Sequence, residues 1–164
     1  MDVVRLTAED HTRTEECARM MVNSEPWITL RRSLGSAMAT LLDPGKEVYA
    51  VLDDQNISAF IILELRGPFA GYIQTVCVRP DRRGRGLGAA LIGWAEQRIA
   101  RESPNVFLCV SSFNVAARRL YERLGYQVVG SLAGFVVREH DELLLRKSRG
   151  PWAEFRGSVD QRPA

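Results

Sequence analysis

The stretch Arg83-Gly84-Arg85-Gly86-Leu87-Gly88-Ala89 is a glycine-rich turn that opens a predicted helix. The first backbone N–H groups of a helix have no partner within it, and the positive end of the helix dipole lies there, so such a turn attracts anions. Its three glycines let phosphate oxygens approach the backbone without a Cβ in the way. Arg82, Arg83 and Arg85 add charge-assisted donors. The stretch therefore predicts a pyrophosphate site.

Two nucleotide-binding motifs share glycines with this turn, and neither fits. The pattern Gly84-x-Gly86-x-x-Ala89 matches the dinucleotide fingerprint, but that motif needs a strand directly before it and an acid about 20 residues later. Here residues 79–83 separate the turn from the preceding apolar run, and Ser111-Ser112 follows the next one. A P-loop would need Gly-Lys-Ser/Thr after the glycines. A solvated surface turn without a ligand is the simpler alternative.

A second motif lies about thirty residues further along: Asn114-Val-Ala-Ala117-Arg-Arg-Leu-Tyr121-Glu-Arg-Leu-Gly125-Tyr126. It places an amide and a phenol on one predicted helix, seven residues and therefore about two turns apart. Gly125 stands where a left-handed C-cap ends a helix. Asn114 would also be a favourable N-cap, and Tyr121 would also suit the core face of an amphipathic helix. Both side chains therefore have a structural alternative.

Hydrophobic periodicity and turn residues predict the other elements. Their order is βααβββαβαββ, which is typical of a mixed, mostly antiparallel sheet with helices on its faces. The expected helices are 9–23, 29–42, 86–101 and 114–124, and the expected strands are 2–6, 47–52, 57–66, 69–78, 106–110, 126–132 and 135–145. One domain would cover residues 1–147, followed by a polar C-terminal tail over 148–164.

Both motifs together resemble those of the GNAT superfamily of acyl-CoA-dependent N-acyltransferases. That family's Arg/Gln-x-x-Gly-x-Gly/Ala is met by Arg83-x-x-Gly86-x-Gly88, and its Val-x-Pro by Val78-Arg79-Pro80. Its later motif Asn-x-x-Ala-x-x-x-Tyr-x-x-x-Gly-Phe/Tyr is met at every place from Asn114 to Tyr126. The resemblance implies a three-layer α+β fold: about seven mostly antiparallel strands, flanked by about four helices and splayed between the fourth and fifth strands.

The resemblance also implies roles for the matching residues. Acetyl-CoA would be the co-substrate, with its pyrophosphate on the amides of Gly84–Ala89. The strand end Val76–Val78 would pair with the pantetheine arm, and Asn114 would hydrogen-bond the pantetheine or adenosine part. Tyr121 would protonate the departing thiolate, because a thiol and a phenol have similar pKa values of about 8.5 and about 10. The implied cofactor contacts are Val76, Cys77, Val78, Arg83, Gly84, Arg85, Gly86, Leu87, Gly88, Ala89 and Asn114.

The motifs do not identify the base that deprotonates the acceptor. Several GNAT members carry a glutamate five residues before the motif's asparagine, but this chain has Cys109 there, more simply a buried thiol than a nucleophile. Glu64 is the predicted replacement, because a carboxylate within the apolar run 60–65 needs a reason to be there. Its alternatives are that Glu64 faces solvent, or that Gln74 and Thr75 order a water.

Composition limits other partners. The formal net charge of +2 gives no field that would attract nucleic acid, although the arginines of residues 79–85 leave an RNA-binding module as an alternative. Three cysteines and two histidines lack the spacing of a metal site or a disulfide framework, so we expect no metal and a reducing cytoplasm. No apolar run approaches the about 20 residues of a membrane span, and no signal-peptide pattern is present.

The expected function is direct transfer of an acetyl group from acetyl-CoA to a primary amine, through a ternary complex. The acceptor would be a small molecule, a peptide or a protein N-terminus, with Glu25 and Trp27 as walls of its site. A catalytically silent acyl-CoA-binding sensor is the alternative from another class. A monomer or a homodimer is expected, in which Trp152 and Phe155 of the tail would dock on the domain or on a second copy.

Overall fold

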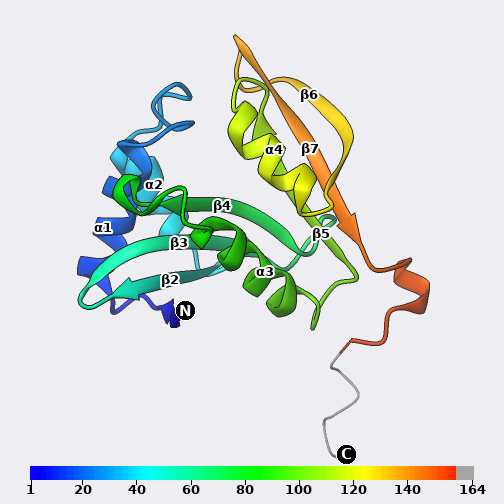
Figure 1. Ribbon diagram of the computed structural model, residues 1–164, viewed down its shortest axis with the longest axis horizontal. Coiled ribbons are helices and arrows are strands. Elements are labelled where there is room, and N and C mark those ends of the chain that lie inside the picture. Colours follow the sequence, from blue (N-terminus) through cyan, green and yellow to red (C-terminus); the bar gives the residue numbers. More distant parts are fainter. Residues whose placement is uncertain (158–164) are drawn as a thin grey trace, which may run out of the picture.

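The structure, a computed structural model, describes residues 1–157 as a central sheet with helices on both faces (Figure 1). The strands are β1 (Val3–Leu6), β2 (Glu47–Asp53), β3 (Asn56–Glu64), β4 (Tyr72–Val78), β5 (Asn105–Ser111), β6 (Gln127–Val137) and β7 (His140–Ser148). The α-helices are α1 (His11–Val22), α2 (Leu34–Leu41), α3 (Leu87–Ile99) and α4 (Val115–Arg123). Two short 3₁₀ helices are η1 (Pro80–Arg82) and η2 (Trp152–Glu154).

The sheet has seven strands in the order β1-β2-β3-β4-β5-β7-β6. Neighbouring strands are antiparallel except β4 and β5, which run parallel with α3 as the crossover between them. The predicted fold class is thus confirmed, with its mostly antiparallel strands, its four helices and its three layers.

Two apolar cores lie on opposite faces of the sheet. Residues Ile57–Leu63 of β3 are all buried, as expected for a strand that is covered on both faces. Ile61 packs toward α3, whereas Phe60 and Ile62 pack toward α1 and α2. The long apolar run of β3 therefore holds the three layers together.

β4 and β5 pair only over a short stretch, at the start of β4. Tyr72 is opposite Phe107 and Ile73 is opposite Leu108, and within residues 1–157 no further pair between the two strands follows. A β-bulge lies at this point of β4: the pairing with β3 passes from Ile73 to Thr75, so Gln74 is the extra residue. Because a bulge bends a strand and increases its twist, β4 turns away from β5. The two strands diverge toward their C-terminal ends, as the resemblance implied.

Two regions differ most from the predicted element boundaries. The second helix begins at Leu34 rather than near residue 29, because Ser33 is its N-cap and accepts a hydrogen bond of 3.1 Å from Ser36 N. The turn between the last two strands lies at Arg138-Glu139, not near residues 133–134. Gly134 lies within β6 instead, with φ +57°, where the pairing with β7 shifts register.

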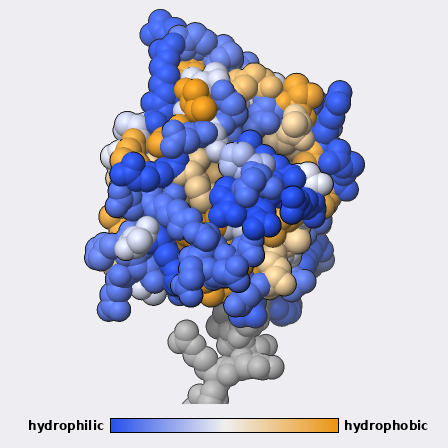
Figure 2. Space-filling model, turned by 60° about the vertical axis from the view of Figure 1, so that its left-hand side comes forward, coloured by the Kyte–Doolittle hydropathy of each residue, from blue (hydrophilic) through white to orange (hydrophobic). Residues whose placement is uncertain are grey.

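The final strand ends at Ser148, next to the expected domain boundary. In the tail, the rings of Trp152 and Phe155 meet edge to face with centroids 5.5 Å apart, and residues 158–164 lie outside the described residues. Within residues 1–157, no helix combines the length and apolar character needed to cross a membrane. Figure 2 shows one face of the molecule mostly covered by hydrophilic residues, with apolar residues in separate patches.

Candidate active site

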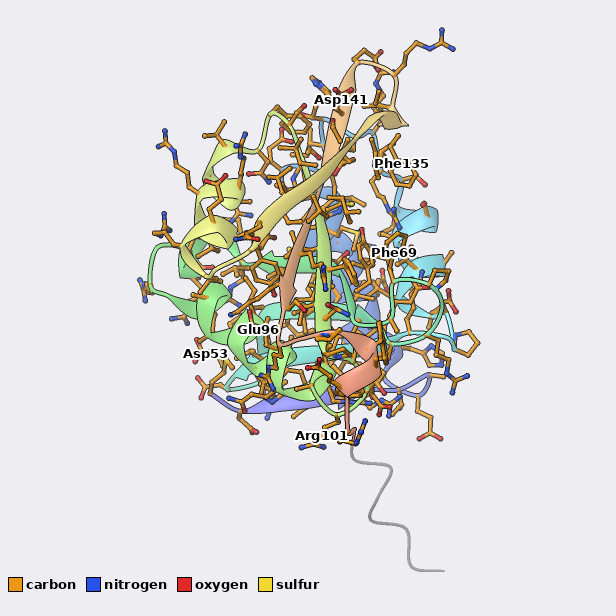
Figure 3. All side chains as sticks on the ribbon, turned by 90° about the vertical axis from the view of Figure 1, so that its right-hand side faces the viewer. Asp53, Phe69, Glu96, Arg101, Phe135 and Asp141 are labelled. Carbon is orange, nitrogen blue, oxygen red and sulfur yellow. The ribbon has the colours of Figure 1, made fainter. Side chains whose placement is uncertain are left out.

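A cleft of about 850 Å³ opens where β4 and β5 diverge. The glycine turn and the start of α3 form one wall with β4, and α4 forms the other with β5; the connection between α1 and α2 and parts of β6 and β7 close one end. Phe135 of β6 lies near Asp141 of β7 at this end of the sheet (Figure 3). Of the sequence-predicted residues, this one cleft brings together Val76, Cys77, Val78, Arg83, Gly84, Gly86, Leu87, Gly88, Ala89, Asn114 and Tyr121.

The glycine turn has the open backbone that anion binding requires. Gly84 and Gly86 have φ values of +73° and +80°, in the left-handed region that favours glycine, and a Cβ on either would meet nothing within 4 Å. Gly86 is the N-cap of α3 and supplies no side-chain cap. A Cβ on Gly88 would instead lie 3.5 Å from Val78 Cγ2. The turn thus leaves space above its first two glycines, and Gly88 brings α3 close to β4.

The three arginines of the turn differ in what they contact. Arg83 donates from Nε to Val78 O at 2.9 Å and from a terminal nitrogen to Ser24 Oγ at 3.1 Å. Arg82 forms an ion pair with Asp53. The Arg85 side chain is exposed, lies outside the cleft lining and makes no hydrogen bond or ion pair within residues 1–157. Two of the predicted anion contacts are therefore engaged with the protein, and within residues 1–157 Arg85 is the one of the three without a polar partner.

The end of β4 presents backbone to the cleft. Among the described strands none pairs with the β5 side of β4 beyond Ile73, so Val76–Val78 face the opening there. The Cys77 side chain points into the core on the α1 and α2 face, where burial raises the pKa of its thiol to about 12. Cys77 is thus a protonated core residue, and only its backbone is available to a ligand in the cleft.

Helix α4 carries the two polar residues of the second motif. Asn114 Oδ1 accepts a hydrogen bond of 3.2 Å from Ala117 N, so the predicted capping role is real. Its Nδ2 group donates to no residue within 1–157. Tyr121 lies two turns along the helix and packs edge to face on Tyr126, with ring centroids 6.0 Å apart. Burial raises the pKa of the Tyr121 phenol to about 12, so the phenol is protonated near neutral pH.

Glu64 and Cys109 occupy different positions relative to the cleft. Glu64 is the last residue of β3, opposite Tyr72, and does not line the cleft, so its role as a base stays a prediction. Cys109 does line it, half-buried on β5. Burial raises the pKa of the Cys109 thiol; the nearby Tyr72 hydroxyl lowers this pKa, and the Glu142 carboxylate raises it further.

Glu142 is a cleft residue that the sequence analysis missed. It lies on β7 opposite Ser111, is only 5% exposed, and accepts a hydrogen bond of 2.5 Å from Ser111 Oγ. Burial raises the pKa of its carboxyl group, against smaller lowering effects of Ser111 and His140. The sequence signal was the one applied to Glu64: a carboxylate directly beside an apolar run, here residues 143–145.

A family comparison agrees with this geometry. The model of the acetyltransferase (GNAT) family matches residues 6–126, most of the chain, and the match includes both motifs. The chain belongs to the GNAT acetyltransferase family. The match ends at Tyr126, so β6, β7 and Glu142 lie beyond it.

Known GNAT relatives resemble the chain in parts of its length. A mycothiol acetyltransferase of Mycobacterium leprae is 48% identical over 65 residues, which are 36% of this chain and 21% of that protein. The chain thus spans about a fifth of the length of that relative.

Solved structures share the fold over nearly the whole chain. An aminoglycoside 6′-N-acetyltransferase complexed with coenzyme A gives a TM-score of 0.73 at 15% identity, covering 92% of this chain and 98% of that one. The ribosomal-protein-S18-alanine N-acetyltransferase of Escherichia coli gives 0.71 at 18% identity, covering 93% and 96%. At these identities the likeness shows the fold alone.

Proposed function

We propose that this GNAT protein transfers the acetyl group of acetyl-CoA directly to a primary amine, in a ternary complex of protein, donor and acceptor. The observation that carries the proposal is the continuity of one cleft, which is lined by the glycine turn, the unpaired edge of β4 and Tyr121. A pyrophosphate, an extended arm and a thioester follow one another in acetyl-CoA in the same order.

The donor half of the cleft fits acetyl-CoA in charge and shape. Unpaired amides at the start of α3 would take the pyrophosphate, with Arg85 as the exposed cation beside it. The backbone of Val76–Val78 would pair with the pantetheine amides, as an added strand does at a sheet edge. A structural relative is complexed with coenzyme A, which supports the same ligand here.

Tyr121 is the proposed proton donor to the leaving thiolate. Its phenol lies in the wall of the cleft and stays protonated because burial raises its pKa to about 12. General acids of this kind typically contribute about 10²-fold or more to rate. The nearby Asn114, whose Nδ2 group donates to no residue within 1–157, would hold the cofactor.

The acceptor would enter from the opposite end, past Glu25 and Trp27. We propose a small molecule, a peptide or a protein N-terminus as the source of the amine. We further propose that the protein acts in the cytoplasm as a monomer or homodimer. It would bind no nucleic acid, because its net charge is near neutral, and no metal, because its cysteines and histidines lack metal-site spacing.

A silent acyl-CoA sensor is the second candidate, because Cys109 stands at the place where several family members carry a glutamate. The two candidates are separated by measuring free thiol from acetyl-CoA against a panel of amines: peptide N-termini, polyamines, aminoglycosides and amino acids. Amine-dependent thiol release supports the enzyme. Coenzyme A binding by calorimetry without release on any amine supports the sensor, and no binding contradicts both.

A further inference from the structure

Glu142 is a buried carboxylate without a cation. At 5% exposure it is the one aspartate, glutamate, lysine or arginine in the buried set of the described residues. No arginine, lysine or histidine forms an ion pair with it within residues 1–157. Burying an unpaired carboxylate is costly, so such a group is usually protonated or neutralised by a cation from outside the chain. Because Glu142 lines the cleft, a cation from outside the chain can reach it.

The surroundings of Glu142 leave one of its oxygens available. Ser111 Oγ donates to Oε1 at 2.5 Å, and Oε2 accepts from no residue within 1–157. The titratable groups that face it are Tyr72 from β4, Cys109 from β5 and His140 on its own strand. On the β6 side its partner is Leu132, which is apolar. β4, β5 and β6 carry no positive side chain that would compete with a cation for Oε2. Arg32, on the connection between α1 and α2, also lines the cleft, but it donates to Ser36 O and Thr40 Oγ1 and forms no ion pair with Glu142 within residues 1–157.

Glu142 and Tyr121 approach the cleft from opposite faces of the sheet. Tyr121 packs against the α3-side core together with Leu143 of β7. Successive strand residues point to opposite faces, so Glu142 points away from that core, on the side of α1 and α2. Both side chains line the same cleft because β4 and β5 have separated there. A thioester in the gap would have an acid on one side and a carboxylate on the other.

We propose that Glu142 takes the proton of the acceptor's ammonium group, and that its buried charge selects acceptors that enter as primary ammonium ions. The inference rests on the proposed acetyl transfer and adds to it the base and the charge of the acceptor. Burial raises the pKa of the carboxyl group, which brings it closer to the working range of a base near neutral pH.

Glu142 and Tyr121 together account for every proton transferred in the reaction. One N–H proton of the ammonium passes to Glu142 Oε2, and the freed lone pair forms the N–C bond to the thioester carbonyl. The C–S bond then breaks with its electron pair on sulfur, which takes the phenolic proton of Tyr121. The second N–H proton returns to Tyr121 as the amide forms, and Glu142 releases its proton to water. One proton leaves per turnover.

The test compares two small acceptors of similar shape, ethylamine and 2,2,2-trifluoroethylamine. At pH 7 the first is an ammonium ion, whereas the second is largely neutral and needs no base before attack. Glu142→Gln is expected to lower kcat/KM for ethylamine by about 10²-fold and to change that for trifluoroethylamine by less than about twofold. Ser111→Ala should move the acidic limb of the ethylamine profile to higher pH, because the lost hydrogen bond stabilises the charged carboxylate.

Several results would overturn the proposal. Equal losses with both amines would show a structural role, and unchanged kinetics would remove Glu142 from the chemistry. Loss of the acidic limb in Glu64→Gln but not in Glu142→Gln would move the role to Glu64. The exposed Glu122→Gln, on the surface pair with Arg118, is the matched control and should leave both rates unchanged.

Binding of a cation by Glu142 can also be tested without turnover, by an NMR titration. If the wild-type protein acetylates neither amine, the ¹³C resonance of the Glu142 carboxyl is titrated with and without ethylammonium. Ethylammonium should lower the pKa of that carboxyl in the wild type, because a bound cation favours the charged form. An unaltered titration curve overturns the inference even where acetyl transfer to other amines is found.

Discussion

Arg83 Nε donates a hydrogen bond of 2.9 Å to the backbone oxygen of Val78, and so ties the glycine turn to the end of β4. A second bond of 3.1 Å to Ser24 Oγ joins the turn to the segment that follows α1. The arginine of the family motif, although exposed, therefore fixes the position of the glycine turn through these two hydrogen bonds. Arg85, two residues later, is also exposed but makes no such contact within residues 1–157.

Arg83 and Arg85 are accordingly expected to affect acetyl-CoA binding differently. Arg85→Ala should weaken binding through lost charge, so its effect should shrink as salt rises. Arg83→Ala should weaken binding by about tenfold or more at every salt concentration, because it loosens the turn itself. Calorimetric titration of coenzyme A at low and high salt checks both. Parallel salt dependence in the two variants would contradict the distinction.

Asn114 is expected to carry a capping role and a ligand role that substitutions can separate. Asn114→Ala removes the bond to Ala117 N and should lower the free energy of unfolding by about 1 kcal/mol. Asn114→Ser keeps a capping oxygen but loses the amide, so stability should be retained while coenzyme A binding falls. Urea unfolding and calorimetry measure the two quantities. Full coenzyme A affinity in Asn114→Ser would leave the residue as a cap alone.

Most of the donor half could be predicted from the sequence because its chemistry resides in local motifs. A glycine turn at a helix start and an Asn and Tyr two turns apart depend on neighbours along the chain. The two motifs line one cleft because they follow β4 and β5, which run parallel. The late start of α2 was missed because Ser33 competes as an N-cap with a helical apolar pattern that extends further back.

The acceptor half could not be predicted because it depends on contacts across the sheet. Glu142 and Ser111 are 31 residues apart, and only the β5–β7 register brings them together. Glu64 had the same sequence signal but lies at the other side of β4, outside the cleft lining. A carboxylate beside an apolar run thus indicates partial burial without indicating which cavity it faces.

Tyr121→Phe should lower kcat by at least about tenfold and leave coenzyme A affinity nearly unchanged, because the ring still packs but the proton is gone. Since burial raises the pKa of this phenol to about 12, the wild-type rate should not fall through its ionisation below about pH 11. Tyr126→Phe is the control: Tyr126 packs on Tyr121 but does not line the cleft. Equal rates for wild type and Tyr121→Phe would assign proton donation elsewhere.

Gly71, directly before β4, is expected to be essential for the close approach of β4 and β5. It has φ +92°, and a Cβ there would collide with the Asn105 carbonyl oxygen and lie 2.7 Å from Ile99 Cγ2. Gly71→Ala should therefore cost more than about 2 kcal/mol of unfolding free energy. Gly67→Ala is matched in backbone, with φ +85° but nothing within 4 Å, and should cost only about 1 kcal/mol. Similar unfolding midpoints for the two would show that the crowding is relieved.

The buried Glu142 carboxylate should lower the free energy of unfolding at pH values where it is charged. For a carboxyl group whose folded pKa is raised above its unfolded value, stability is greatest below the unfolded pKa and decreases as pH rises through the folded pKa. Glu142→Gln should therefore unfold at higher urea than wild type at pH 8 and at nearly the same urea at pH 4, while losing activity toward ethylamine. A Glu142→Gln protein less stable than wild type at pH 8 would show that the charged carboxylate is satisfied by the fold. Its place in the cleft would then need no cationic acceptor.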